Sequence, residues 1–149
     1  MTDRMKNLAD QVRASHDAKA LFAYMASEFE PANDINASHT CEPERYISDF
    51  PIDLDQRIKA LQVRLASEEE AYRKDFARYT KIRTEGLSAL TDLEIAYNGN
   101  CDPVMAVRSP LLILGSHIAF GKAMLPFLRE QLATCLKARS AAGEQLAMF

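Results

Sequence analysis

The chain has 149 residues and a net charge of −3 at pH 7. That length fits one domain with its own core, and the acidic balance excludes indiscriminate binding to nucleic acid, which needs many cations to neutralise phosphates. Only five glycines and six prolines are present, too few for the frequent chain reversals of an all-β fold. We therefore expect an all-α protein that makes no direct contact with nucleic acid.

The compartment can be predicted from the cysteines and from the apolar segments. Three cysteines, Cys41, Cys101 and Cys135, lie far apart and do not have the density of a disulfide framework. The first residues are polar and lack the apolar run of a signal peptide. The one long apolar stretch, 111–128, is interrupted by a histidine, a lysine and a proline, which favours the central helix of a bundle over a membrane span. We expect a cytoplasmic protein without a membrane partner.

The first predicted element is a helix over 3–30, because apolar residues recur there at helical spacing until Pro31. The pattern then disappears over 31–53, which is rich in Asn, Ser, Asp and Pro, residues that compete with the backbone for hydrogen bonds. This segment is predicted to be a long acidic loop. Loops of more than twenty residues in compact domains are usually functional or disordered.

The strongest helical pattern begins after Asp53, which is a good N-cap with Gln56 three residues later. Its apolar stripe predicts a helix over 54–98, about 65 Å long at roughly 1.5 Å per residue. An Asn-Gly-Asn turn follows, and a last helix is predicted over 103–142, with Gly143 just beyond its end. We expect a three-helix bundle built on a long antiparallel helical hairpin, with residues 1–143 as one domain and 144–149 as a peptide tail.

So long a helix is hard to cover with one shorter partner, which predicts a homodimer. The candidate contacts are Tyr72, Phe76 and Tyr79, where Glu68 and Asp75 interrupt a purely apolar seam.

No pattern of residues predicts catalysis. The sequence contains no P-loop, no nucleophile elbow and no dinucleotide-binding fingerprint. His39 and Cys41 form one local pair, but a zinc site usually needs a second close pair. No Glu has a His three residues later, as di-iron bundles require. We expect a protein that is not an enzyme and holds no metal or cofactor. The basic stripe of Lys74, Arg78 and Lys81 is interpreted as a solvated face or as a contact for the acidic first third.

The last five residues, Gln145, Leu146, Ala147, Met148 and Phe149, form a separate short motif. They resemble the peptide by which bacterial polymerases and repair proteins dock on the replicative sliding clamp: Gln, Leu, a small or polar residue, Leu or Met, then Phe. The resemblance implies that Gln145 is the polar anchor and that Leu146, Met148 and Phe149 enter an apolar pocket of the clamp. Ala147 departs mildly from the favoured Ser or Asp. The match covers five of 149 residues, and the alternative is an amphipathic turn that folds back on the bundle.

Two further hypotheses remain beside a replication or repair adaptor that docks on the clamp. One is a small phage- or plasmid-encoded inhibitor of a host nucleic-acid complex, of the anti-defence (anti-CRISPR) type. Its acidic residues would cover a basic surface; they are Glu28, Glu30, Asp34, Glu42 and Glu44. The other is a self-assembling helical structural protein with no link to the clamp.

Overall fold

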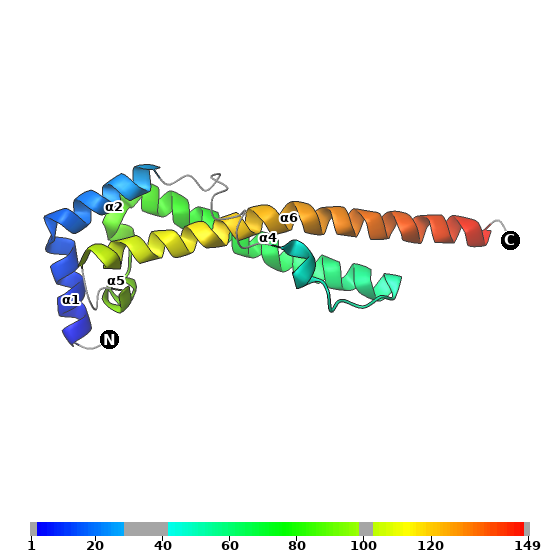
Figure 1. The fold of residues 1–149 in the computed structure, drawn as a ribbon, viewed down its shortest axis with the longest axis horizontal. Coiled ribbons are helices and arrows are strands. Elements are labelled where there is room, and N and C mark those ends of the chain that lie inside the picture. Colours follow the sequence, from blue (N-terminus) through cyan, green and yellow to red (C-terminus); the bar gives the residue numbers. More distant parts are fainter. Residues whose placement is uncertain (1–2, 29–41, 99–102, 148–149) are drawn as a thin grey trace. The chain divides into compact units, whose positions relative to one another are not determined.

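The computed structural model of the chain describes residues 3–28, 42–98 and 103–147 (Figure 1). Every regular element within these ranges is helical, so the chain is all-α, as the spacing of its apolar residues predicts. The elements in order are α1 (Asp3–Ala14), α2 (His16–Glu28), the short 3-10 helix η1 (Pro43–Tyr46), α4 (Leu54–Glu85), the 3-10 helix η2 (Gly86–Ala89), α5 (Asp92–Asn98) and α6 (Pro103–Ala147).

The first predicted helix is two helices that meet at Ser15. The Ser15 hydroxyl oxygen accepts a hydrogen bond from the backbone N–H of Ala18 at 3.2 Å, which caps the first turn of α2. The Ser15 backbone N–H donates to the carbonyl of Val12 at 3.1 Å, which tightens the end of α1. A residue that satisfies backbone groups on both sides ends one helix and begins the next.

The second predicted helix begins as expected and ends earlier. The Asp53 carboxylate accepts a hydrogen bond from the Gln56 backbone N–H at 3.1 Å, which confirms Asp53 as the N-cap of α4. The prediction of one helix through residue 98 is wrong, because Gly86 adopts a positive φ of 70° and Leu90 is extended. Positive φ is accessible to glycine without a Cβ penalty. Thr91 then starts α5.

The last helix is longer than predicted. Gly143 lies inside α6 rather than beyond its end, so residues 144–147 are helical and not a separate tail. Nothing within 4 Å of Gly143 would meet an added Cβ, and its φ is not positive. The helix-ending left-handed conformation that glycine often supplies is therefore not used here.

Two compact units divide the chain. Unit 1 comprises residues 1–33 and 74–118, and unit 2 comprises residues 34–73 and 119–149. In unit 1, α1 packs against α5 and α2 lies against η2. Arg13 of α1 forms an ion pair with Asp92 and also donates a hydrogen bond to the Leu90 carbonyl at 3.0 Å, which ties α1 to the start of α5. The fully buried larger side chains of this unit include Val12, Phe22, Ile82, Leu90, Ile95, Leu111 and Ile118.

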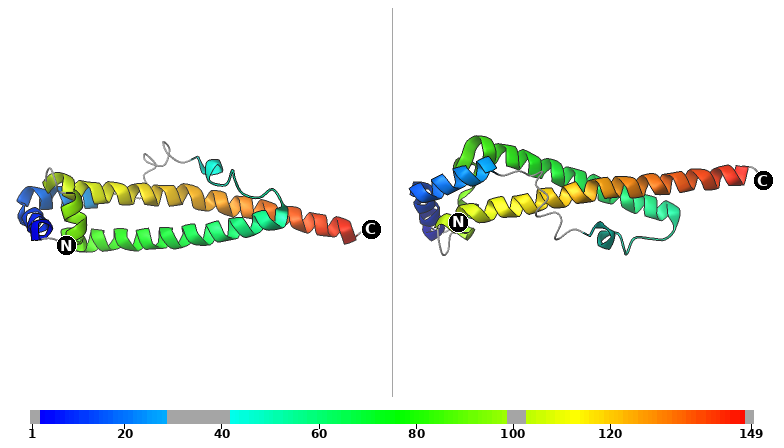
Figure 2. Two further views of the ribbon diagram at one scale, coloured as in Figure 1. Left: turned by 90° about the horizontal axis from the view of Figure 1, so that it is seen from below. Right: turned by 45° about the horizontal axis from the view of Figure 1, so that its top comes forward.

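In unit 2 the first part of α4 and the second part of α6 run side by side in opposite directions (Figure 2). Ion pairs join Asp55 to Arg139 and Glu69 to Arg129, so residues early in α4 face residues late in α6. The core between them contains buried Ile47, Ile58, Leu61, Met124, Leu128 and Cys135. A three-helix bundle of the whole chain stays a prediction.

A close approach between α4 and α6 in unit 2 depends on Gly121. A Cβ added to this buried glycine would lie 2.5 Å from Cδ2 and 3.3 Å from Cγ of Tyr72. Real Cβ atoms do not come that close to a ring carbon. With Tyr72 in its present position, no residue larger than glycine fits at position 121. Glycine is therefore needed at this position because it has no side chain, and not because the backbone turns there.

Candidate functional site

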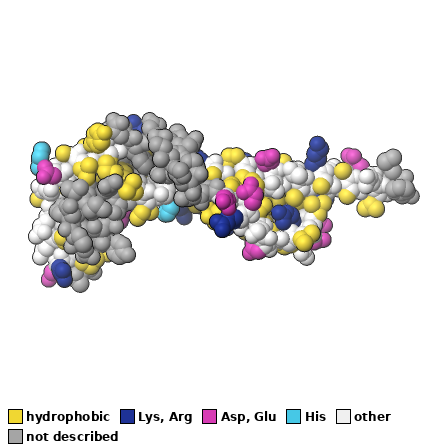
Figure 3. Space-filling view, in the orientation of Figure 1, with side chains coloured by type: hydrophobic (Ala, Val, Ile, Leu, Met, Phe, Trp, Pro, Cys, Tyr) yellow, Lys and Arg dark blue, Asp and Glu magenta, His cyan; other side chains and the backbone are white. Residues whose placement is uncertain are grey.

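The residues of the predicted clamp motif lie in the last turn of α6. Residues 137–146 are all exposed, and Leu146 keeps 78% of its surface in water. Hydrophobic and acidic side chains are visible on this end of α6, at the right of Figure 3. Gln145 and Leu146 therefore pack against no core among the described residues. Met148 and Phe149, the other two predicted clamp contacts, lie outside the described residues.

The predicted acidic surface is described only in part. Glu42 and Glu44 are both exposed, immediately before and within η1. Glu42 forms a weak surface ion pair with Arg45 at 3.5 Å. Glu28 is the last residue of α2, whereas Glu30 and Asp34 lie outside the described residues. Whether the five carboxylates share one face stays a prediction.

The three aromatic residues predicted as dimer contacts pack within the chain. Tyr72 covers Gly121, and Tyr79 is only 8% exposed. The Tyr79 hydroxyl also accepts a hydrogen bond from Arg83 at 2.6 Å. Phe76, 37% exposed, meets the Tyr79 ring edge-on, with the ring centroids 5.9 Å apart. These contacts within the chain account for the positions of Tyr72, Phe76 and Tyr79 without a partner chain. The homodimer stays a prediction.

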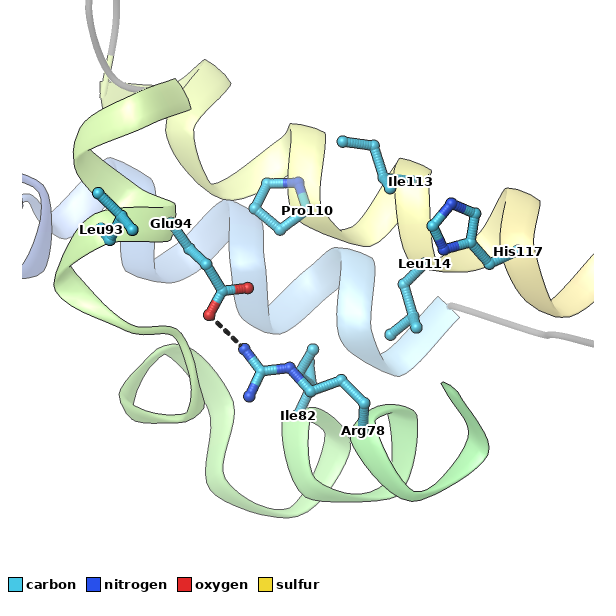
Figure 4. Close-up of a pocket in the computed structure, with 8 residues that line it drawn as sticks. All are labelled: Arg78, Ile82, Leu93, Glu94, Pro110, Ile113, Leu114 and His117. Carbon is cyan, nitrogen blue, oxygen red and sulfur yellow. Dashed lines mark hydrogen bonds and ion pairs between the residues drawn. The ribbon is translucent and has the colours of Figure 1, made fainter. Parts of the chain in front are cut away.

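Unit 1 contains a pocket that no sequence pattern predicted. Its volume is about 420 Å³, and its lining comes from α4, α5 and α6 (Figure 4). The lining residues are Arg78, Ile82, Leu93, Glu94, Pro110, Ile113, Leu114 and His117. Five of these eight are apolar. The polar side chains, one from each helix, converge on the same space.

The acidic wall of the pocket is held by hydrogen bonds. The Glu94 carboxylate accepts one from the Arg78 guanidinium at 2.6 Å and one from the Thr91 backbone N–H at 3.0 Å. The Glu94 backbone N–H donates to the Thr91 hydroxyl at 3.2 Å, which completes a capping box at the start of α5. Burial acts to raise the pKa of Glu94, but the Thr91 hydrogen bonds and Arg78 outweigh it, and the pKa is lowered.

The opposite wall contains His117, which faces an acid on α4. Burial raises the pKa of Asp75, and the nearby His117 partly offsets this rise. Together with Arg78 and Glu94, unit 1 therefore brings two carboxylates, a guanidinium and an imidazole to one region. Of the two acids, Glu94 lines the pocket itself. An acid with a shifted pKa in a concave apolar site is typical of binding sites.

The described residues contain no cluster of side chains that could hold a metal ion, since no three His, Cys, Asp or Glu side chains there are grouped as metal ligands. Cys135 is buried in the core of unit 2, and His39, Cys41 and Cys101 lie outside the described residues. The absence of an enzyme activity stays a prediction.

One described helix segment, Pro110–Leu146, is long and apolar enough to cross a membrane, with half of its most apolar window buried inside the structure. The core helix of a soluble protein meets the same criteria. No family model matches the chain, and no curated protein or solved structure matches it either. Function must therefore be inferred from the described residues and from the short C-terminal motif.

Proposed function

We propose that this protein is a non-enzymatic interaction module that docks on the bacterial sliding clamp through Gln145, Leu146, Met148 and Phe149. The observation that carries the proposal is the exposure of Leu146, which leaves 78% of a large apolar side chain in water at the end of α6. A tail that folded back on the core would bury this residue. The sliding clamp is proposed as the partner because residues 145–149 resemble the peptides that bind it.

Docking requires the last turn of α6 to open. Gln145 and Leu146 are neighbours in a helix and therefore point in different directions. Both can enter one site if the turn unwinds, and the last turn of a helix is its least stable part because its carbonyls lack intrahelical partners. The residues before it, 137–144, are exposed as well, so unwinding costs little packing.

The expected affinity follows from the apolar side chains. Burying Leu146, Met148 and Phe149 contributes about 1.5–3 kcal/mol each, or about 4.5–9 kcal/mol together. Ordering the segment and the loss of free motion oppose this gain. A micromolar Kd corresponds to about −8.2 kcal/mol, so micromolar or weaker binding is the expected range.

The test compares a truncation within the motif with a truncation at an exposed position outside it. The full chain and its variants are titrated against a purified bacterial sliding clamp by calorimetry. Leu146→Ala together with Phe149→Ala should weaken binding at least about thirtyfold, as loss of buried anchors does. Ile52→Ala, a matched truncation at a side chain 95% exposed outside the motif, should leave binding unchanged. Equal binding by the tail variant and the wild type would make the motif a coincidence.

The inhibitor hypothesis is a second candidate, supported by the exposure of Glu42 and Glu44. Charged surfaces mainly accelerate association with a partner of opposite sign. Replacing both residues with Gln should then slow association with a basic nucleic-acid complex and leave clamp binding unchanged. The two candidate functions are thereby separated by substitutions at different places.

A further inference from the structure

We propose that the pocket of unit 1 is a binding site for an uncharged, mostly apolar small molecule that carries one hydrogen-bond acceptor. The pocket shares no residue with the clamp motif, and all of its lining lies in unit 1. The inference therefore goes beyond the proposed docking function and does not depend on it.

The size and the apolar lining point to a small molecule. The volume of about 420 Å³ lies within the range of about 300–1,000 Å³ typical of ligand pockets. Ile82 and Leu114 are buried, whereas Leu93 and Ile113 keep 57% and 52% of their surface exposed. An apolar ligand would remove that remaining surface from water, which contributes about 25 cal/mol for each Å² covered.

The charges of the pocket favour an uncharged ligand. Arg78 and Glu94 lie 2.6 Å apart and neutralise each other at one wall (Figure 4). An anionic ligand would have to compete with Glu94 for Arg78, and a cationic ligand would have to compete with Arg78 for Glu94. Either competition leaves one member of a partly buried pair without its partner, which is costly. A neutral ligand avoids that cost.

The polar group of the ligand is predicted to be an acceptor. A guanidinium carries five N–H donors, and Glu94 accepts from the NH2 nitrogen of Arg78. Donors of Arg78 therefore remain for a ligand oxygen. His117, on the other side of the pocket, presents an imidazole that carries one N–H donor in either of its neutral tautomers. A carbonyl, ether or hydroxyl oxygen matches these donors.

The walls are held in place before any ligand arrives. Thr91 and Arg78 both fix the Glu94 carboxylate, and the capping box fixes the start of α5 that carries Leu93. Preorganised walls lower the entropic cost of binding. The site is therefore expected to bind a suitable small molecule without rearrangement of the helices.

The test uses two fluorescent probes of similar apolar character and different charge. Nile red is uncharged and carries a carbonyl oxygen, whereas 1-anilinonaphthalene-8-sulfonate is an anion. The folded full chain should bind one Nile red with a blue-shifted emission, at least about tenfold more tightly than the sulfonate, a difference of about 1.4 kcal/mol. Tighter binding of the sulfonate would overturn the charge argument.

Variants then locate the probe. Leu93→Ala with Ile113→Ala should weaken Nile red binding about tenfold, because both side chains are walls of the pocket. Both are half-exposed, so the fold should survive, as circular dichroism will show. Ile52→Ala, at a side chain 95% exposed in unit 2, is the control and should have no effect. Equal losses at both places would mean that the probe binds apolar surface generally, and the proposal would be wrong.

A charge variant makes the selectivity testable in the same protein. Glu94→Gln keeps the capping function, since Gln also serves in a capping box, and leaves Arg78 without its counter-ion. The sulfonate should then bind at least about fivefold more tightly than it binds the wild type, and its disadvantage against Nile red should shrink or reverse. An unchanged ratio of the two affinities would contradict a site beside Arg78. If the protein forms a dimer and Nile red binds only after dilution has dissociated it, the pocket is instead part of the dimer interface.

Discussion

Substitution of Gly121 tests the packing of unit 2. Glycine inside a helix normally destabilises it by about 0.5–1 kcal/mol relative to alanine, so Gly→Ala at an ordinary position of α6 raises stability. At Gly121 the new Cβ would lie 2.5 Å from Cδ2 of Tyr72. Rotation of the ring about its own axis does not relieve the 3.3 Å contact with Cγ. The tyrosine or the helix itself must therefore move, and overpacking of this kind costs about 1–3 kcal/mol.

Gly143 supplies the control in the same helix. It is exposed, and a Cβ there meets nothing within 4 Å. Both substitutions share the gain in helix propensity, so their difference isolates the contact with Tyr72. We expect Gly121→Ala to be about 1–3 kcal/mol less stable than Gly143→Ala, or about 2–4 °C in Tm for each kcal/mol. Thermal and urea unfolding measure the difference.

A double-mutant cycle completes the test. The penalty of Gly121→Ala should largely disappear in a Tyr72→Ala background, because the atoms that the Cβ meets are gone. A Gly121→Ala variant as stable as Gly143→Ala, or a penalty that persists without Tyr72, would refute the close approach of α4 and α6 at this point.

Three further predictions concern unit 1. Ser15→Ala should lower stability by about 0.5–2 kcal/mol, because the cap of α2 is lost, with urea unfolding as the measurement. Arg13→Ala and Asp92→Ala should be non-additive by about 0.5–1 kcal/mol in a double-mutant cycle, a modest value because both side chains are one-third exposed. Glu94→Gln should cost about 1 kcal/mol at pH 7. The lowered pKa of Glu94 means that its contribution is complete above its ordinary pKa of 4.5 and is lost as the pH falls through the folded-state value. The difference in Tm between wild type and Glu94→Gln should therefore shrink below pH 4.5, and a difference that grew there would contradict the assignment.

The helical class could be predicted from apolar spacing alone, and the cap at Asp53 was predicted correctly because its chemistry is local. The breaks at Ser15 and Gly86 could not be predicted, because they do not depend on local chemistry alone. Serine and glycine are tolerated inside helices, and only the contacts of the neighbouring turns decide whether the chain bends there. Conversely, the sequence predicts that Gly143 lies just beyond the end of the last helix, yet it lies inside α6.

The pocket of unit 1 could not be predicted, because it combines side chains that are distant in sequence. Arg78 and Glu94 are sixteen residues apart, and His117 joins them from α6. Part of the signal was nevertheless present: Thr91 and Glu94 have the spacing of a capping box, which would have placed a helix start at residue 92. Residues 145–149 are the opposite case, because their resemblance to a clamp-binding peptide is visible in the sequence, whereas the packing around them is not.

The affinity of the intact protein for a purified bacterial sliding clamp, measured across salt concentrations, tests the docking proposal most directly. Apolar anchors such as Leu146 depend little on ionic strength, whereas binding through exposed carboxylates is screened by salt. We predict a Kd in the micromolar range or weaker that changes less than about threefold between about 50 and 300 mM salt. No measurable binding, or binding that falls steeply with salt, would contradict a clamp anchor at residues 145–149.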